Sequence, residues 1–214
     1  MLRSHSVWLV PVALTLVGFG SGATKAIAQT TYPFNAEYDI VVETEEIAPG
    51  ISKGTAVGES ADASYGLTNL MSMSYSQVDP NTGVITAGPD ATAFGLEGLP
   101  ILTDVFFGSS NDRLFGTNTA TVFTDFENLT ATASGTVTIT GGSGRFSGAT
   151  GTLSLTDYYT LSPDPNAPLI GQALVNGSIQ VVPEPGTEIG TLIGIGAIST
   201  GVLLRRRRYR PTSG

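Results

Sequence analysis

The chain has 214 residues, with 18 acidic and 10 basic side chains and a net charge of −8. The basic residues gather at the two ends, so residues 29–184 carry 17 acidic against 3 basic side chains, a net charge of −14. Such a segment is unsuited to nucleic acid and to anionic membrane surfaces, because both are contacted through Lys and Arg.

The central segment lacks two residue types on which many active sites depend. The sequence has no Cys, and its one His is His5, close to the start. A Ser-His-Asp triad, a Cys nucleophile and a His-ligated zinc site are therefore excluded between residues 29 and 184. Without disulfides the fold must depend on its apolar core, and about 155 residues are enough for one such domain.

Residues 1–28 have the pattern of a secretory signal peptide. Arg3 precedes an apolar stretch at residues 7–19, and Ala26-Ile27-Ala28 forms a small-x-small cleavage site. This predicts a signal helix, Sec-type export and removal by signal peptidase, with Gln29 as the mature N-terminus. The alternative is an N-terminal membrane anchor.

The first half of the central segment, residues 29–182, reads as strands and turns. Residues 34–43 alternate between apolar and polar, which predicts an antiparallel strand with one wet face. Residues 43–46 with Pro49-Gly50 predict a turn. Further strands are expected at 55–62, 64–78 and 84–86, with a tight Asp-Pro-Asn-Thr-Gly turn at 79–83. Residues 88–118 favour a structured loop with one short strand or helical turn, and residues 102–107 are the best strand candidate.

The second half is richer in Thr and Val and predicts strands at 119–126, 129–140, 152–161 and 171–182. Residues 162–168 form a Pro-rich loop. Asn176-Gly177 could turn a hairpin, but its arms would be short, so we expect one strand with a bulge. Because helical periodicity is missing before the tail, we predict an all-β domain of about eight strands, either a single antiparallel barrel or a β-sandwich.

A glycine-rich stretch joins two of these strands, with the sequence GTVTITGGSGRFSGATGTLSL. It resembles the allene-oxide-cyclase-like barrel family, in which a strand ending in Gly-Gly is followed by Gly-Arg-Phe and Gly-Ala-Thr-Gly. The resemblance implies an eight-stranded antiparallel barrel and, in some members, a cyclase or a small apolar ligand. No catalytic residue can be matched, so we do not transfer that chemistry. We expect a structural turn with Phe146 at the barrel end and Arg145 paired with a carboxylate; its residues are Gly141, Gly142, Gly144, Arg145, Phe146, Gly148 and Gly151.

The tail has three parts in a fixed order. Pro183-Glu184-Pro185 is stiff and extended, residues 189–204 form an apolar run, and Arg205, Arg206, Arg207 and Arg208 open a basic cluster at 205–210. This end resembles the PEP-CTERM sorting signal of bacterial exported proteins. The resemblance implies a transmembrane helix, transient residence in the inner membrane with the domain outside, and cleavage by an exosortase. The alternative is a permanent C-terminal anchor.

Carboxylates are the remaining candidates for chemistry. Glu37 with Asp39, or Asp125 with Glu127, could form a glycosidase-like pair, although alternate acids also mark the solvent face of a strand. We expect no cofactor. Residues 79–83 and 43–46 offer oxygen ligands for calcium but lack the EF-hand spacing.

These observations lead to three hypotheses. The first is a non-enzymatic protein of the cell surface or extracellular matrix, with exopolysaccharide as a partner that the sorting signal implies. The second is a barrel that binds a small ligand or carbohydrate, which an open interior would support. The third is a cyclase-like or carboxylate-based enzyme, which requires two carboxyls, or a Tyr and a carboxyl, converging in a pocket.

Overall fold

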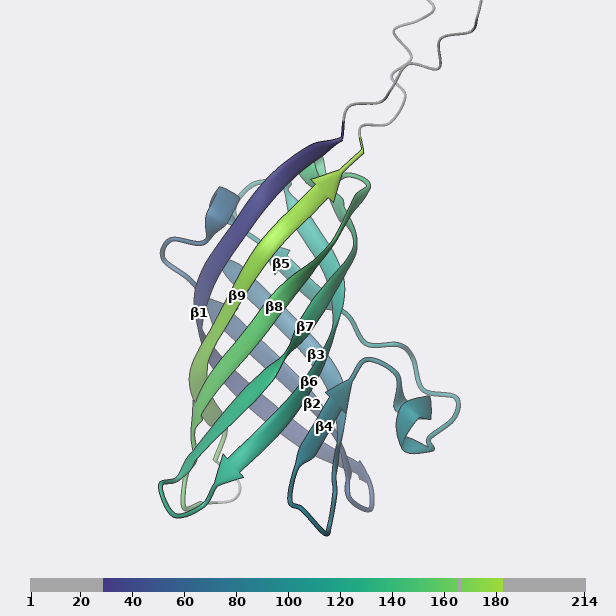
Figure 1. The fold of residues 1–214 in the computed structure, drawn as a ribbon, viewed down its shortest axis with the longest axis vertical. Helices are drawn as coiled ribbons and strands as arrows, with labels where there is room; N and C mark the ends of the chain where they lie inside the picture. The colour runs from purple at the N-terminus through teal and green to yellow at the C-terminus, as the bar shows by residue number, and fades with distance from the viewer. Residues whose placement is uncertain (1–28, 165–166, 183–214) are drawn as a thin grey trace, which may run out of the picture.

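The computed structural model describes residues 29–164 and 167–182, which form one antiparallel sheet (Figure 1). The expected signal peptide and the tail from Pro183 onward lie outside these residues. The all-β prediction is confirmed. The nine strands are β1 (Thr30–Ala48), β2 (Ile51–Glu59), β3 (Asn69–Val78), β4 (Ile85–Gly88), β5 (Asp104–Phe107), β6 (Arg113–Asp125), β7 (Thr130–Ser143), β8 (Ala149–Thr160) and β9 (Leu169–Val181).

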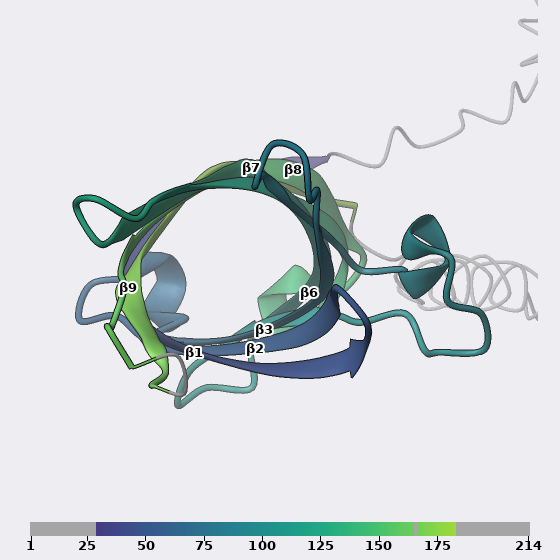
Figure 2. The same cartoon turned by 90° about the horizontal axis from the view of Figure 1, so that it is seen from below.

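The strand pairings close the sheet into a ring, seen end-on in Figure 2. The order is β2-β1-β9-β8-β7-β6-β4-β3, and β3 pairs again with β2. The short strands β4 and β5 share one position between β3 and β6: β4 pairs with residues 75–78 of β3, and β5 pairs with residues 69–71. The ring therefore has eight positions, although the chain supplies nine strands.

Period-two alternation determines which side chains enter the ring. On β1, Phe34, Tyr38 and Ile40 are buried, whereas Asn35, between two inward residues, is exposed. Large side chains fill the half of the interior nearest to Thr30 and Val181, the upper end in Figure 1. The largest of them are Tyr38, Leu67, Phe106, Leu114, Phe146, Leu153 and Ile179.

The upper end of the ring is closed by the segment between β7 and β8. The 3-10 helix η3 (Gly144–Phe146) places Phe146 in the core, where its ring packs edge-on against Tyr32 and Tyr65. Arg145 Nε donates a 2.8 Å hydrogen bond to Asp112 Oδ2, and the Arg145 backbone N–H donates to Asp112 Oδ1 at 2.9 Å. Phe146 thus lies at the end of the ring, and Arg145 has a carboxylate partner.

Several local expectations differ from the structure. Residues 43–46 continue β1 and pair with residues 52–55 of β2, so the turn is limited to Pro49-Gly50. Residues 64–66 form the 3-10 helix η1 (Ser64–Gly66) instead of the start of a strand. Asn176-Gly177 lies within β9 with unbroken register on both sides, so the expected bulge is wrong. Gly141 and Gly142 belong to β7 and Gly151 to β8, which leaves a shorter turn than expected.

The long connection from β4 to β5 packs on the outside of the ring. It contains the 3-10 helix η2 (Ala91–Phe94), and it covers Tyr75, which faces outward yet is buried with Ala91 and Leu102. Tyr75 Oη donates to the Pro100 carbonyl at 3.0 Å. Helical structure in the described residues is limited to these 3-10 turns, so none of them is long and apolar enough to cross a membrane.

Candidate functional site: an interior cavity with buried carboxylates

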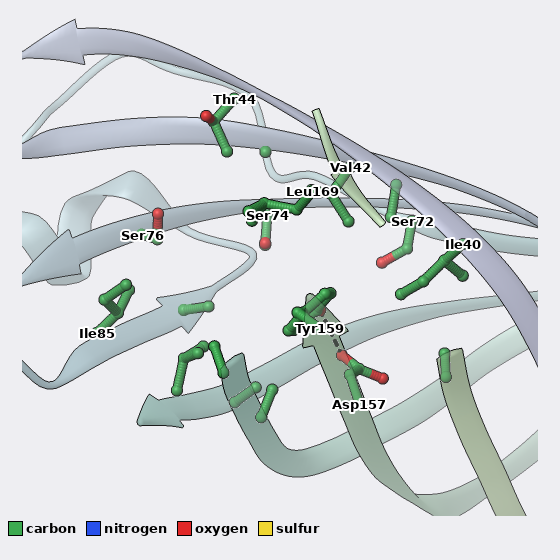
Figure 3. A pocket seen from close by; sticks show the side chains of 18 of the residues that line it. Ile40, Val42, Thr44, Ser72, Ser74, Ser76, Ile85, Asp157, Tyr159 and Leu169 are labelled. Carbon is green, nitrogen blue, oxygen red and sulfur yellow. Dashed lines mark hydrogen bonds between the residues drawn. The ribbon is translucent and has the colours of Figure 1, made fainter. Parts of the chain in front are cut away.

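The lower half of the ring interior is hollow, with a cavity of about 350 Å³ (Figure 3). Its wall is mostly apolar and is formed by inward-facing residues of all the strands except β5. The cavity reaches the strand ends far from Thr30 and Val181, where Phe126 lines it and is itself 77% exposed. It therefore opens to solvent at the end opposite to the one closed by Phe146.

Small side chains explain why this half of the ring is empty. Inward-facing positions carry Phe, Tyr and Leu in the upper half of the ring, whereas many of those in the lower half carry Gly, Ala, Ser and Thr. Because side chains fill a small eight-position ring only when they are large enough, a run of small residues leaves space. The small lining residues are Thr44, Gly54, Ala56, Ser72, Ser74, Ser76, Ala87, Ala120, Thr124, Ala131, Ala133 and Ala173.

Asp157 and Tyr159 lie side by side on the inner face of β8. The Tyr159 hydroxyl donates a 2.8 Å hydrogen bond to Asp157 Oδ2, drawn as a dashed line in Figure 3. The residues that pair with Asp157 across the sheet are Ala133 on β7 and Ala173 on β9, which offer no side-chain donor. Asp157 is 7% exposed, and its Oδ1 atom has no hydrogen-bond partner.

A second buried carboxylate lies where β4 and β5 leave a gap between β3 and β6. Asp104 Oδ1 accepts hydrogen bonds from Ser72 Oγ at 2.7 Å and from Asn118 Nδ2 at 2.8 Å. Asn118 Nδ2 also lies 3.1 Å from Ser72 Oγ, so the three side chains bridge β3, β5 and β6. Asp104 is 1% exposed, and its Oδ2 atom has no partner.

Burial disfavours negative charge at both groups, and the charge of Asp104 adds to this effect at Asp157. The pKa of Asp157 is raised to about 6, chiefly by burial; the hydrogen bond from Tyr159 lowers it and the charge of Asp104 raises it, and both effects are included in this value. Burial also raises the pKa of Asp104, against the hydrogen bonds from Ser72 and Asn118. Burial raises the pKa of Tyr159, so its hydroxyl keeps its proton at neutral pH.

The carboxyl pairs suggested by alternation do not lie in this cavity. Glu37 and Asp39 are exposed on the outer face of β1. Asp125 accepts hydrogen bonds from the Glu127 and Asn128 backbone N–H groups at the β6–β7 turn, where Glu127 is exposed. These side chains belong to the solvent-exposed surface and to a turn.

The segments considered for calcium have structural roles in the fold. Asp79 Oδ1 accepts from the Asn81 backbone N–H at 2.8 Å, which stabilises the tight turn at 79–83. Residues 43–46 are part of β1. Within residues 29–164 and 167–182, the structure has no cluster of three or more metal-ligating side chains.

Tyr158-Tyr159 and Phe106-Phe107 are adjacent aromatic pairs, and the two members of each pair lie on opposite faces of the sheet because successive side chains of a strand alternate. Tyr159 enters the cavity while Tyr158 is 52% exposed, and Phe106 is buried in the core while Phe107 lies on the outer surface.

Asp157 and Asp104 were missed by sequence reasoning. The available signal was a carboxylate in phase with Leu153 and Leu155, and another in phase with Phe106.

The arrangement combines an apolar chamber with one polar point. The chamber can accept an apolar molecule, and Asp157 Oδ1 can accept a hydrogen bond from it. The Asp157–Tyr159 pair also contains a carboxylate and a protonated hydroxyl, the two kinds of group needed for general base and general acid steps.

No protein-family model, curated protein or solved structure matches this chain.

Proposed function

We propose that this chain is an exported protein whose domain is an eight-stranded antiparallel barrel that binds a small, mainly apolar ligand. The observation that carries this proposal is the 350 Å³ cavity, walled by apolar side chains and opening at one end. Cavities of this size and character are typical of small-molecule sites, and a ring of eight strands has room for one such ligand. The buried Asp157 Oδ1, which has no hydrogen-bond partner, can accept a hydrogen bond from a ligand in the cavity.

Binding of prodan, a neutral fluorophore that brightens in apolar surroundings, tests the proposal. We expect the full chain to bind it and Ala120→Phe to remove that binding, because the new ring occupies the cavity. Thr119→Phe is the matched control, since Thr119 is exposed on the other face of the same strand. Equal binding by wild type and Ala120→Phe would reject the cavity as the site.

A second candidate function is acid–base catalysis on the bound molecule, which the Asp157–Tyr159 pair favours. Asp157, when ionised, would take a proton from the ligand, and the Tyr159 hydroxyl would donate one to it. Ligand recovered from the protein after long incubation distinguishes the two functions by its mass and by deuterium uptake from heavy water. Uptake that Asp157→Asn abolishes would support catalysis, whereas unchanged ligand would leave binding alone.

The sorting proposal rests on the sequence of residues 1–28 and 183–210. The domain would be exported, held in the inner membrane and released or attached outside after exosortase cleavage near Pro183-Glu184-Pro185. The mature protein would then act at the cell surface or in the extracellular matrix, where exopolysaccharide is a candidate partner. Replacing the three motif residues by alanines should retain the full-length chain in the membrane, as measured by intact mass; secretion of a processed chain despite the replacement would reject it.

A further inference from the structure

We propose that the ligand of this cavity carries a protonated amine, which donates a hydrogen bond to Asp157 Oδ1 while its apolar part occupies the chamber. This inference rests on the proposed binding function and names the chemical class of the ligand. An aliphatic amine of about the size of octylamine represents that class.

The cavity contains an unsatisfied hydrogen-bond acceptor. Asp157 lines the cavity, is more than nine-tenths buried and has one oxygen with no hydrogen-bond partner. Its cross-strand neighbours Ala133 and Ala173 leave this oxygen uncovered. A buried acceptor without a donor is costly, so a ligand that supplies the donor gains affinity at this point.

The described side chains near Asp157 supply negative charge and no positive charge. Asp104 lies close enough for its charge to act on Asp157, and it too has an oxygen without a partner. The basic side chains of the described residues are Lys53, Arg113 and Arg145, none of which lines the cavity. Arg145 pairs with Asp112, and Arg113 lies over the ring of Phe107 on the outer surface. A positive charge near the two carboxylates must therefore come from the ligand.

An amine suits this site better than other polar groups do. An alcohol supplies the missing donor but leaves the buried negative charge uncompensated, and a fatty acid adds a further negative charge. An ammonium group supplies both the donor and the opposite charge. The net charge of −14 on residues 29–184 also attracts cations to the domain. The expected order of affinity is amine, then alcohol, then carboxylate.

The surroundings of Asp157 predict how this preference responds to pH. Across the sheet it faces Ala133 of β7 and Ala173 of β9, and on its own strand it faces Tyr159. Among the remaining strands, the titratable group that acts on Asp157 is Asp104 of β5. Asp104 accepts hydrogen bonds from Ser72 of β3 and Asn118 of β6. The residues of β1 and β2 that line the cavity are uncharged. Because the pKa of Asp157 is raised to about 6, protonation below that pH should weaken amine binding.

Displacement of prodan from the full chain by octylamine, octanol and octanoate tests the inference at about pH 8, where octylamine is protonated. Only the signal that Ala120→Phe removes is counted as cavity binding. We expect half-displacement at an octylamine concentration about tenfold lower than for octanol, with octanoate weakest, because hydrogen bonds to charged groups are stronger than neutral ones. In Asp157→Asn, the half-displacement concentration of octanol divided by that of octylamine should fall close to one.

Equal or tighter binding of octanol than octylamine would overturn the inference, as would a preference that persists in Asp157→Asn. The pH profile of the wild type gives an independent arm if the variant does not fold: a ratio that stays constant between pH 8 and pH 5 also contradicts it. When octanol displaces the probe but amines have no advantage, the inference fails and ligand binding stands. When Ala120→Phe removes no signal, ligand binding itself fails, and the amine proposal fails with it.

Discussion

The Tyr159 hydroxyl donates a 2.8 Å hydrogen bond to Asp157 Oδ2, from a residue two positions further along the same face of β8. This bond satisfies one carboxylate oxygen of Asp157 and leaves the other free within the cavity. A buried carboxylate that is half satisfied costs stability when it is ionised, and the donor of the proposed ligand would relieve that cost.

Asp157→Asn should stabilise the protein at neutral pH. Between pH 3.8 and about 6 the folded state binds a proton that the unfolded state has released, so wild-type stability falls as pH rises through that window. A rise in pKa from 3.8 to about 6 corresponds to roughly 3 kcal/mol. In urea denaturation at several pH values, the free energy of unfolding of the variant, relative to that of wild type, should increase by up to that amount between pH 4 and pH 7. A difference that does not change with pH would contradict the buried, ionisable carboxylate.

Tyr159→Phe should extend to higher pH the range in which stability falls as Asp157 ionises. The Tyr159 hydroxyl favours the ionised form of Asp157, so its removal raises the pKa of Asp157 above about 6. Titration of the Asp157 carboxyl carbon by NMR in wild type and variant measures this directly. An unchanged or lower pKa in Tyr159→Phe would show that the hydrogen bond does not act on Asp157.

Asp112→Ala should destabilise the closed end of the ring by about 1–3 kcal/mol, because the Arg145 backbone N–H loses its acceptor together with the guanidinium. Arg145→Gln should cost less, about 0–1 kcal/mol, since the Arg145 side chain is half exposed and the backbone hydrogen bond remains. Denaturant midpoints of the two variants give the comparison. An equal loss in both would mean that the ion pair, and not the backbone contact, holds the turn.

The Asp112 contribution should also depend on pH. The hydrogen bond from the Arg145 backbone, then the side-chain bond and the charge of Arg145, lower the pKa of Asp112. Stability from this group is therefore present above its unfolded pKa and is lost as pH falls through the folded value. Acid unfolding should show a smaller gap between wild type and Asp112→Ala at low pH; a gap that widens there would contradict the lowered pKa.

Gly142→Ala and Gly141→Ala form a matched pair on adjacent residues of β7. A Cβ at Gly142 would lie 2.5 Å from the Phe146 carbonyl oxygen and 2.6 Å from that of Arg113, whereas a Cβ at Gly141 meets no atom within 4 Å. We expect Gly142→Ala to cost about 1–3 kcal/mol and Gly141→Ala to be close to neutral. Thermal unfolding of both variants checks this, and similar melting temperatures would contradict the close approach of η3 to β7.

Much of the fold could be predicted because it depends on local alternation. The period of two in β1 and β8 and the turn chemistry at residues 79–83 are sequence-local signals, and both produce the expected elements. Residues 43–46 precede Pro49-Gly50, and the sequence predicts one turn over both. In the folded chain residues 43–46 are held in β1 by pairing with β2, a contact that local sequence does not reveal.

The site was harder to predict because it depends on where alternating faces meet. Asp104 and Asp157 are 53 positions apart in the sequence and approach each other only when the ring closes and β4 and β5 share one position. The inward phase of Leu153, Leu155 and Asp157 was visible, but the phase does not show whether the interior is filled. The cavity arises from small residues contributed by several strands, which no single stretch of sequence displays.

Crystals of the protein grown with 1-bromohexane test ligand binding in the ring interior most directly, because anomalous scattering locates the bromine atom. We expect a bromine peak inside the cavity, among Ala56, Ala120 and Ala133, and its loss in Ala120→Phe. A cavity without bromine at saturating 1-bromohexane, or bromine found only on the outer surface, would show that the ring interior is not a binding site for apolar molecules.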